Sequence, residues 1–241
     1  MLDSGAPVAR GATDLRESQL TIALPRLDRS TAGQRGITIA DFLVPIQVGE
    51  RISARARHIA LVVAGALFIA LTANFWVPIP GSPVPLTGQT FSVLLVGCAL
   101  GMTRGVLATS LYLALGFFLP VYAEQASGVS HIATVQGGTV VLGATGGYLI
   151  GFVVASGVVG RLAELGWDRH LAGAVGAMAL GNVIIYVFGI PWLMAATGMN
   201  FSTAINLGVV PFVLTDLIKL ALAAGLFPLA WWIVGKRPGE R

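Results

Sequence analysis

Residues 211–234 read PFVLTDLIKLALAAGLFPLAWWIV, an apolar run that nevertheless carries two formal charges, Asp216 and Lys219. The run is long enough to cross a bilayer as a helix, since about 20 residues span the hydrocarbon core. An ionisable side chain near the middle of such a helix costs about 2.5–3.5 kcal/mol, so it normally faces a partner, a cavity or a substrate path. A separation of three places both side chains on one helical face. The spacing leaves two interpretations open, a structural ion pair and a ligand or ion site.

The composition around this run is that of an integral membrane protein. Of the 241 residues, 55% are hydrophobic and 11% charged, which is outside the range of soluble domains. The first 58 residues hold 8 of the 15 Lys and Arg and 6 of the 11 Asp and Glu. The basic charge therefore belongs to the ends and loops, and no nucleic-acid partner is expected. The single cysteine, Cys98, excludes an intrachain disulfide and is expected to be a small buried side chain.

The first 57 residues lack a sustained apolar run and contain three prolines. They are predicted to be a mostly disordered cytoplasmic extension, although an upstream start codon assigned in error would produce such a stretch too. Residues 58–241 are predicted to form the membrane domain.

Six apolar runs predict six transmembrane helices in an all-α bundle. The second and third runs have only 15 residues each and are separated by a tight turn at Met102–Arg104. They are either a helical hairpin extended by adjoining residues or partly re-entrant segments. The six runs are Ile59–Val77, Thr87–Gly101, Gly105–Leu119, Val140–Gly160, Leu171–Ala195 and Val209–Val234.

The distribution of basic residues predicts the orientation, because Lys and Arg near span ends favour the cytoplasmic side. If the first span runs outward, every Lys and Arg except Lys219 is cytoplasmic. Both termini are then cytoplasmic, and Asp216 and Lys219 lie about 10 Å and about 15 Å below the outer end of the last span.

Four other polar residues, Thr87, Gln89, Tyr148 and Tyr186, fall at comparable depth, and Asn182 lies deeper. Each alone is more often a packing residue, but together they predict a membrane-embedded pocket that opens outward. The proline strap, defined as residues 78–85 with four prolines, is stiff and extended. It is either a wall or lid of this pocket or a simple rigid connector.

Small residues four apart let membrane helices approach closely. Such spacing occurs at Ala60 and Ala64 in the first run and throughout the glycine-rich fourth run. Most patterns of this kind serve internal packing, and a minority mark contact with another membrane protein.

In six fragments that follow in order between Ile59 and Val234, the chain resembles the BioY family, the biotin-binding S components of energy-coupling-factor (ECF) transporters. The segment Glu124–Gly138 is longer and more polar than the loop usual there. The fragments are VPLTGQT at 84–90, GMTRG at 101–105, YLALG at 112–116, LPVY at 119–122, GATGGYLIGF at 143–152, and Pro211 followed by DLIK at 216–219.

The resemblance implies an S-component-like bundle of six helices in the plasma membrane, which captures biotin from outside without a cofactor and without chemistry on the substrate. It also implies a transmembrane coupling subunit and two cytoplasmic ATPase subunits as partners, contacted partly through Ala60 and Ala64. Biotin presents a carboxylate and, on its ureido ring, two N–H donors. Lys219 is expected to bind the carboxylate, and Asp216, helped by Asn182 or Tyr148, to accept from the ureido ring.

Three alternatives remain. The same architecture could carry another vitamin or precursor. An intramembrane enzyme using Asp216 or His131 would need a second converging acid, nucleophile or metal set, and the sequence shows no such motif. A purely structural scaffold would leave the charged residues of the last run unexplained. Neither catalytic nor metal-binding residues are therefore predicted.

Overall fold

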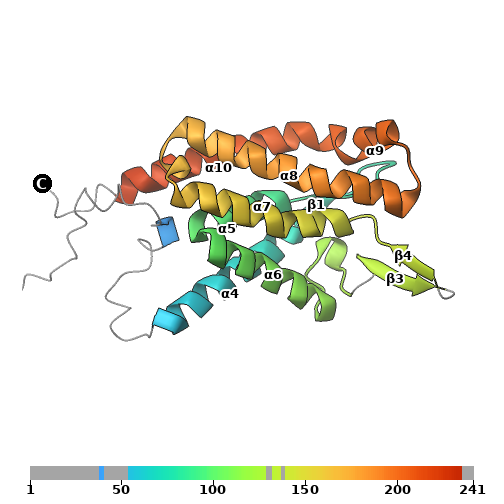
Figure 1. Ribbon diagram of the computed structural model, residues 1–241, viewed down its shortest axis with the longest axis horizontal. Helices are drawn as coiled ribbons and strands as arrows, with labels where there is room; N and C mark the ends of the chain where they lie inside the picture. The colour runs from blue at the N-terminus through green and yellow to red at the C-terminus, as the bar shows by residue number, and fades with distance from the viewer. Residues whose placement is uncertain (1–37, 41–53, 129–131, 137–138, 235–241) are drawn as a thin grey trace, which may run out of the picture.

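The computed structural model describes residues 38–40, 54–128, 132–136 and 139–234, which form an elongated bundle of helices (Figure 1). Most of the predicted extension, together with His131, lies outside the described residues. Within the predicted extension, Thr38, Ile39 and Ala40 are described and buried, and residues 54–57 form the first turn of a helix that begins at Ala54.

Among the described residues, five helical segments are long and apolar enough to cross a membrane; four lie in α4, α7, α8 and α10, and the fifth continues from α6 to Gln125. Helix α5 has only 12 residues, about 18 Å of axial rise against about 30 Å for the hydrocarbon core. A sixth crossing therefore stays a prediction. The helices are α4 (Ala54–Ala73), α5 (Gln89–Leu100), α6 (Met102–Phe118), α7 (Gly146–Glu164), α8 (Leu171–Thr197), α9 (Phe201–Gly208) and α10 (Val210–Val234).

Several boundaries differ from the sequence prediction; the first helix, for example, covers Ala54–Ala73 rather than Ile59–Val77. Residues 102–104 are the first turn of α6 rather than a connecting turn. The break between α5 and α6 is Gly101 alone, whose φ of 83° is accessible to glycine at little cost. The fourth run begins its helix at Gly146 rather than at Val140, because residues 139–142 pair with another strand instead.

The fold is mostly helical, but two small antiparallel hairpins correct the all-α prediction. In the first, β1 (Trp76–Val77) pairs with β2 (Leu86–Thr87), which closes the proline strap at its base. In the second, β3 (Ala133–Gln136) pairs with β4 (Thr139–Leu142). Two short 3-10 turns, η1 (Ala123–Gln125) and η3 (Trp167–Arg169), complete the described elements.

Helix α7 is the most buried of the long helices and runs through the middle of the bundle (Figure 1). Its glycines lie where neighbouring helices come closest. A side chain at Gly147 would collide with Trp192 of α8, and one at Gly160 would collide with the backbone at Gly101. The small residues of this run therefore serve internal packing, as close helix contact in lipid requires.

The small residues of α4 occupy two different faces. Ala66 and Ala70 are buried in the bundle, whereas Ala60 and Ala64 are exposed on its surface. The spacing pattern is the same in both pairs, and only the structure distinguishes them.

The start of α4 and the end of α10 lie at one end of the bundle, and α9 and the β3–β4 hairpin lie at the other (Figure 1). The described ends of the membrane domain are thus on the same side. The assignment of that side to the cytoplasm stays a prediction.

Candidate functional site

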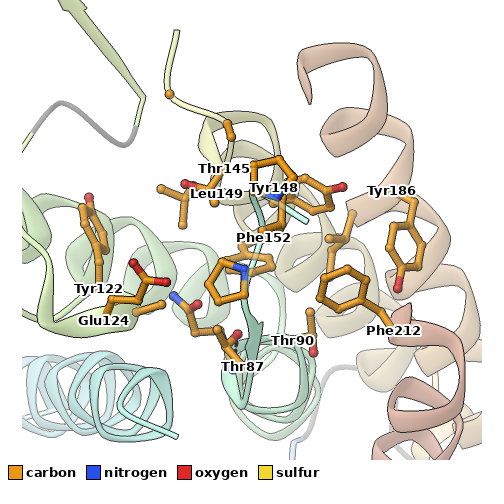
Figure 2. A pocket seen from close by; sticks show the side chains of 18 of the residues that line it. Thr87, Thr90, Tyr122, Glu124, Thr145, Tyr148, Leu149, Phe152, Tyr186 and Phe212 are labelled. Carbon is orange, nitrogen blue, oxygen red and sulfur yellow. Dashed lines mark hydrogen bonds between the residues drawn. The ribbon is translucent and has the colours of Figure 1, made fainter. Parts of the chain in front are cut away.

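A cavity of about 190 Å³ lies among the proline strap, the η1 turn and helices α5, α7, α8 and α10. Thr87 and Thr90 border it on one side and Thr145 and Tyr148 on the other (Figure 2). Its lining residues are Pro83, Val84, Pro85, Thr87, Gln89, Thr90, Tyr122, Ala123, Glu124, Gly143, Ala144, Thr145, Tyr148, Leu149, Phe152, Ile185, Tyr186, Phe212, Asp216 and Lys219.

The Lys219 ammonium group is held at the wall of this cavity by three acceptors. It donates to the main-chain carbonyl of Thr87 at 2.7 Å, to Thr90 Oγ1 at 2.9 Å and to Asp216 Oδ1 at 3.4 Å. An ammonium group has three N–H donors, so the protein can occupy all of them. The contact with Asp216 is the longest and is the one that a bound anion could most readily replace.

Asp216 is buried and has a protein partner on each carboxylate oxygen. Tyr186 of α8 donates to Oδ2, and Lys219 approaches Oδ1. The two interpretations left open by the sequence therefore coincide, since the ion pair is formed and both of its members line the cavity.

Gln89, at the start of α5, is fixed by a buried polar network. Its amide nitrogen donates to the Tyr112 hydroxyl of α6, and Ser92 donates to the Gln89 carbonyl at 3.0 Å. Thr72 of α4 donates in turn to Ser92 Oγ at 2.6 Å. Buried polar groups that are satisfied in this way rigidify their surroundings. The start of α5 is therefore a rigid part of the cavity wall.

Tyr148 lies on the opposite wall and connects three helices. Its hydroxyl donates to the Gly208 carbonyl of α9 at 3.1 Å, and its ring meets that of Tyr186 edge to face at a centroid distance of 6.5 Å. The apolar side chains of Phe152 and Phe212 fill the space between the polar walls (Figure 2). Such a mixture of apolar walls with a few fixed polar groups is typical of small-molecule sites.

The proline strap is a wall of the cavity rather than a simple connector. Pro83, Val84 and Pro85 face the cavity. Ser82 Oγ donates to the Leu207 carbonyl at 2.8 Å, and this hydrogen bond attaches the proline strap to α9.

Six of the seven residues predicted from the sequence line this cavity; the exception is Asn182. It borders a separate space of about 10 Å³ that also touches Thr90 and Lys219. The sequence reasoning missed Thr90 and Glu124. Thr90 ends the VPLTGQT fragment and directly follows Gln89, a position that could have identified it, whereas no sequence signal pointed to Glu124.

No group of three or more His, Cys, Asp or Glu side chains comes together to hold a metal ion within the ranges that the structure describes.

Comparison with known proteins places these features in a family. The sequence profile of the BioY family matches residues 47–236. The chain belongs to the BioY family. The match includes every residue that lines the cavity, and it leaves the buried segment Thr38–Ala40 outside.

Among BioY relatives, a protein of Pyrococcus horikoshii named as a probable biotin transporter is 37% identical over 171 residues, covering 70% of this chain and 93% of the relative. The biotin transporter of Thermotoga maritima is 39% identical over 165 residues, covering 68% of this chain and 90% of the relative. A biotin transporter of Lactococcus lactis, BioY2, is 33% identical over 176 residues, covering 71% and 88%.

The BioY fold also has a counterpart among solved structures. The crystal structure of the S-component for biotin from an ECF-type ABC transporter superposes with a TM-score of 0.63 at 22% identity, covering 74% of this chain and 92% of the other. At this identity the likeness concerns the fold. It agrees with the S-component-like helical bundle expected from the sequence.

Proposed function

We propose that this BioY-family chain is the substrate-binding membrane subunit of a biotin uptake system. The observation that carries the proposal is the Lys219–Asp216–Tyr186 cluster in the wall of a largely apolar cavity. The relatives named above as biotin transporters support the choice of biotin as the ligand.

The cavity has the groups that biotin needs. The Lys219 ammonium group offers a cation for the valerate carboxylate, and a charge-assisted hydrogen bond of this kind is worth about 1.5–3 kcal/mol. The carboxylate would replace Asp216 Oδ1, the most distant of the three lysine partners. Asp216 would keep its hydrogen bond from Tyr186. Phe152, Ile185 and Phe212 would surround the thioether ring and the aliphatic chain.

The protein would act from the cell membrane, with six crossings and with the shared end of α4 and α10 in the cytoplasm. Arg104, Arg161 and Arg169 are all near that end, which agrees with the preference of basic residues for the cytoplasmic side. The cavity would then face outward, and biotin would be captured without chemical change.

Energised uptake would need partners, because the chain has no nucleotide-binding motif. We expect an ECF transmembrane coupling subunit and two cytoplasmic ATPase subunits. The exposed face of α4 at Ala60 and Ala64 offers small side chains on which another membrane helix could pack closely.

The test is equilibrium binding of labelled biotin to the purified protein, in competition with a panel of other vitamins and precursors. Biotin should bind and should be displaced by unlabelled biotin far better than by any other member of the panel. Preference for a different vitamin would replace biotin as the substrate while leaving the S-component architecture. Absence of binding by any member would reject the capture function.

A further inference from the structure

The η1 turn brings a second carboxylate, that of Glu124, to the cavity. Glu124 and Tyr186 border opposite sides of the cavity (Figure 2), and Tyr186 is the hydrogen-bond partner of Asp216. The biotin hypothesis as derived from the sequence assigns no role to Glu124.

The turn is anchored at Tyr122, the residue at its start. The Tyr122 side chain is buried, its hydroxyl donates to the Leu113 carbonyl at 2.7 Å, and its ring meets Tyr112 edge to face at 5.7 Å. Gly116 leaves the space that this ring fills, since a side chain there would collide with it. The backbone of the turn is closed by a 3.1 Å hydrogen bond from Tyr122 N–H to the Ala126 carbonyl.

Within this anchored turn, two consecutive non-glycine residues have left-handed backbone torsions. The φ values are 62° at Glu124 and 54° at Gln125. Such torsions are uncommon for residues with a Cβ and persist where the surrounding structure holds them, often at ligand sites. Only Glu124 of the two lines the cavity.

The Glu124 carboxylate differs from that of Asp216 in its surroundings. It makes neither a hydrogen bond nor an ion pair with any side chain in the part of the chain that the structure describes. Asp216, in contrast, has partners on both oxygens. Of the two carboxylates that line the cavity, Glu124 is therefore the one whose acceptor capacity is unused.

The shape of biotin makes this difference important. Its carboxylate and its ureido ring are at opposite ends of the molecule, separated by an aliphatic chain. Lys219 and Asp216 are only 3.4 Å apart, so an extended ligand that places its carboxylate on Lys219 turns its ureido ring away from Asp216. The assignment of the ureido N–H groups to Asp216, which the sequence suggested, does not fit such a ligand.

We propose that Glu124 is a specificity-determining residue whose carboxylate accepts hydrogen bonds from the ureido N–H groups of the ligand. This role rests on the proposed function, with the ligand carboxylate at Lys219. The anchored turn fixes the backbone that carries this acceptor before the ligand arrives, which lowers the ordering cost of binding. A ligand without N–H donors at that end would leave the carboxylate desolvated and unpaired, which disfavours it.

The experiment compares wild type, Glu124→Gln and the control Gln125→Ala, which changes the neighbouring left-handed residue outside the cavity. Affinity is measured for three ligands: biotin, biotinamide, which lacks the carboxylate, and 2-iminobiotin, which carries a guanidinium in place of the urea. Exchange of a charged acceptor for a neutral one should weaken biotin about five- to tenfold. Biotinamide should lose the same factor, 2-iminobiotin should lose more, and Gln125→Ala should bind all three as wild type does.

The alternatives give different results. If the carboxylate end of biotin lay beside Glu124, neutralising this residue would tighten biotin and leave biotinamide unchanged, which would overturn the proposal. Wild-type affinity of Glu124→Gln for all three ligands would also overturn it, while leaving the proposed function intact. A wild-type protein that binds none of the three would instead reject the proposed function itself.

Discussion

The ammonium group of Lys219 on α10 donates a 2.7 Å hydrogen bond to the main-chain carbonyl of Thr87, the residue that ends β2. The same group donates to Thr90 Oγ1 in the first turn of α5. One lysine thus fastens the last helix to the base of the proline strap. Lys219 has a structural role in addition to the ligand contact proposed for it, and a test must separate the two.

Replacing Lys219 with Ala should lower biotin affinity at least tenfold while the protein still inserts into the membrane. A lost charge-assisted contact is worth about 1.5–3 kcal/mol, and a factor of ten corresponds to about 1.4 kcal/mol. Biotinamide, which has no carboxylate, should be nearly indifferent to the change. Equal losses for both ligands would show that Lys219 acts through structure alone.

The topology can be tested with single cysteines, because the native Cys98 is buried. We expect Val135→Cys, on an exposed part of β3, to react with a membrane-impermeant maleimide in intact cells. Leu165→Cys, exposed at the opposite end of the bundle, should react only after permeabilisation. Tags at Met1 and Arg241 should both be cytoplasmic. Labelling of the two cysteines from the same side, or termini on opposite faces, would contradict six crossings.

The docking role of Ala60 and Ala64 predicts a specific result for replacement of both by Trp. Since both side chains are exposed, the variant should keep its thermal stability and its biotin affinity when isolated. Co-purification of the coupling subunit and energised uptake should be lost.

The matched control is Ala66→Trp, because Ala66 is fully buried on the same helix. Overpacking should cost this variant at least about 1–3 kcal/mol of stability. If the double variant lost biotin binding in isolation, the docking assignment would be wrong. Normal uptake would show that no partner contacts this face.

The burial of Asp168, in the turn between α7 and α8, predicts that the free energy of unfolding depends on pH. Its Oδ2 accepts a 2.7 Å hydrogen bond from Trp231 Nε1, and its Oδ1 is buried with no hydrogen-bond partner among the described residues. Burial raises the pKa of the Asp168 carboxyl above its ordinary value, although Trp231 and the charge of Arg169 oppose the shift. The folded state therefore holds this proton more tightly than the unfolded chain does.

As pH rises, the unfolded chain loses the proton first, so the free energy of unfolding falls between the unfolded and folded pKa values and stays lower above both. We expect Asp168→Asn to be more stable than wild type at pH 7 by about 1 kcal/mol, or about 2–4 °C in Tm for a chain of this size. The difference should shrink as pH falls to about 4, near the unfolded pKa. Thermal unfolding at both values measures it, and a gap that does not change with pH would contradict the burial argument.

Much of the candidate site could be predicted because its signals are local in the sequence. A charged pair such as Asp216 and Lys219 within an apolar run is visible without any knowledge of neighbours, since the cost of charge in lipid depends on the run itself. The apolar runs located the long helices for the same reason. The similar depths of Gln89, Tyr148 and Tyr186 in their runs predict a shared pocket, and all three line the cavity, whereas Asn182, which the sequence places deeper, does not.

Only the tertiary structure decided the features that depend on distant partners. The start of α7 is at Gly146 because residues 139–142 pair with β3, and hydropathy cannot distinguish an apolar strand from an apolar helical turn. Thr90 belongs to the site because Lys219, 129 residues away in the chain, reaches it. Glu124 lines the cavity because the Tyr122 hydroxyl donates to the Leu113 carbonyl of α6 and because Glu124 and Gln125 adopt left-handed torsions. The composition and residue spacing of a segment indicate whether it prefers lipid or water. These contacts instead arise from packing between segments that are far apart in the sequence.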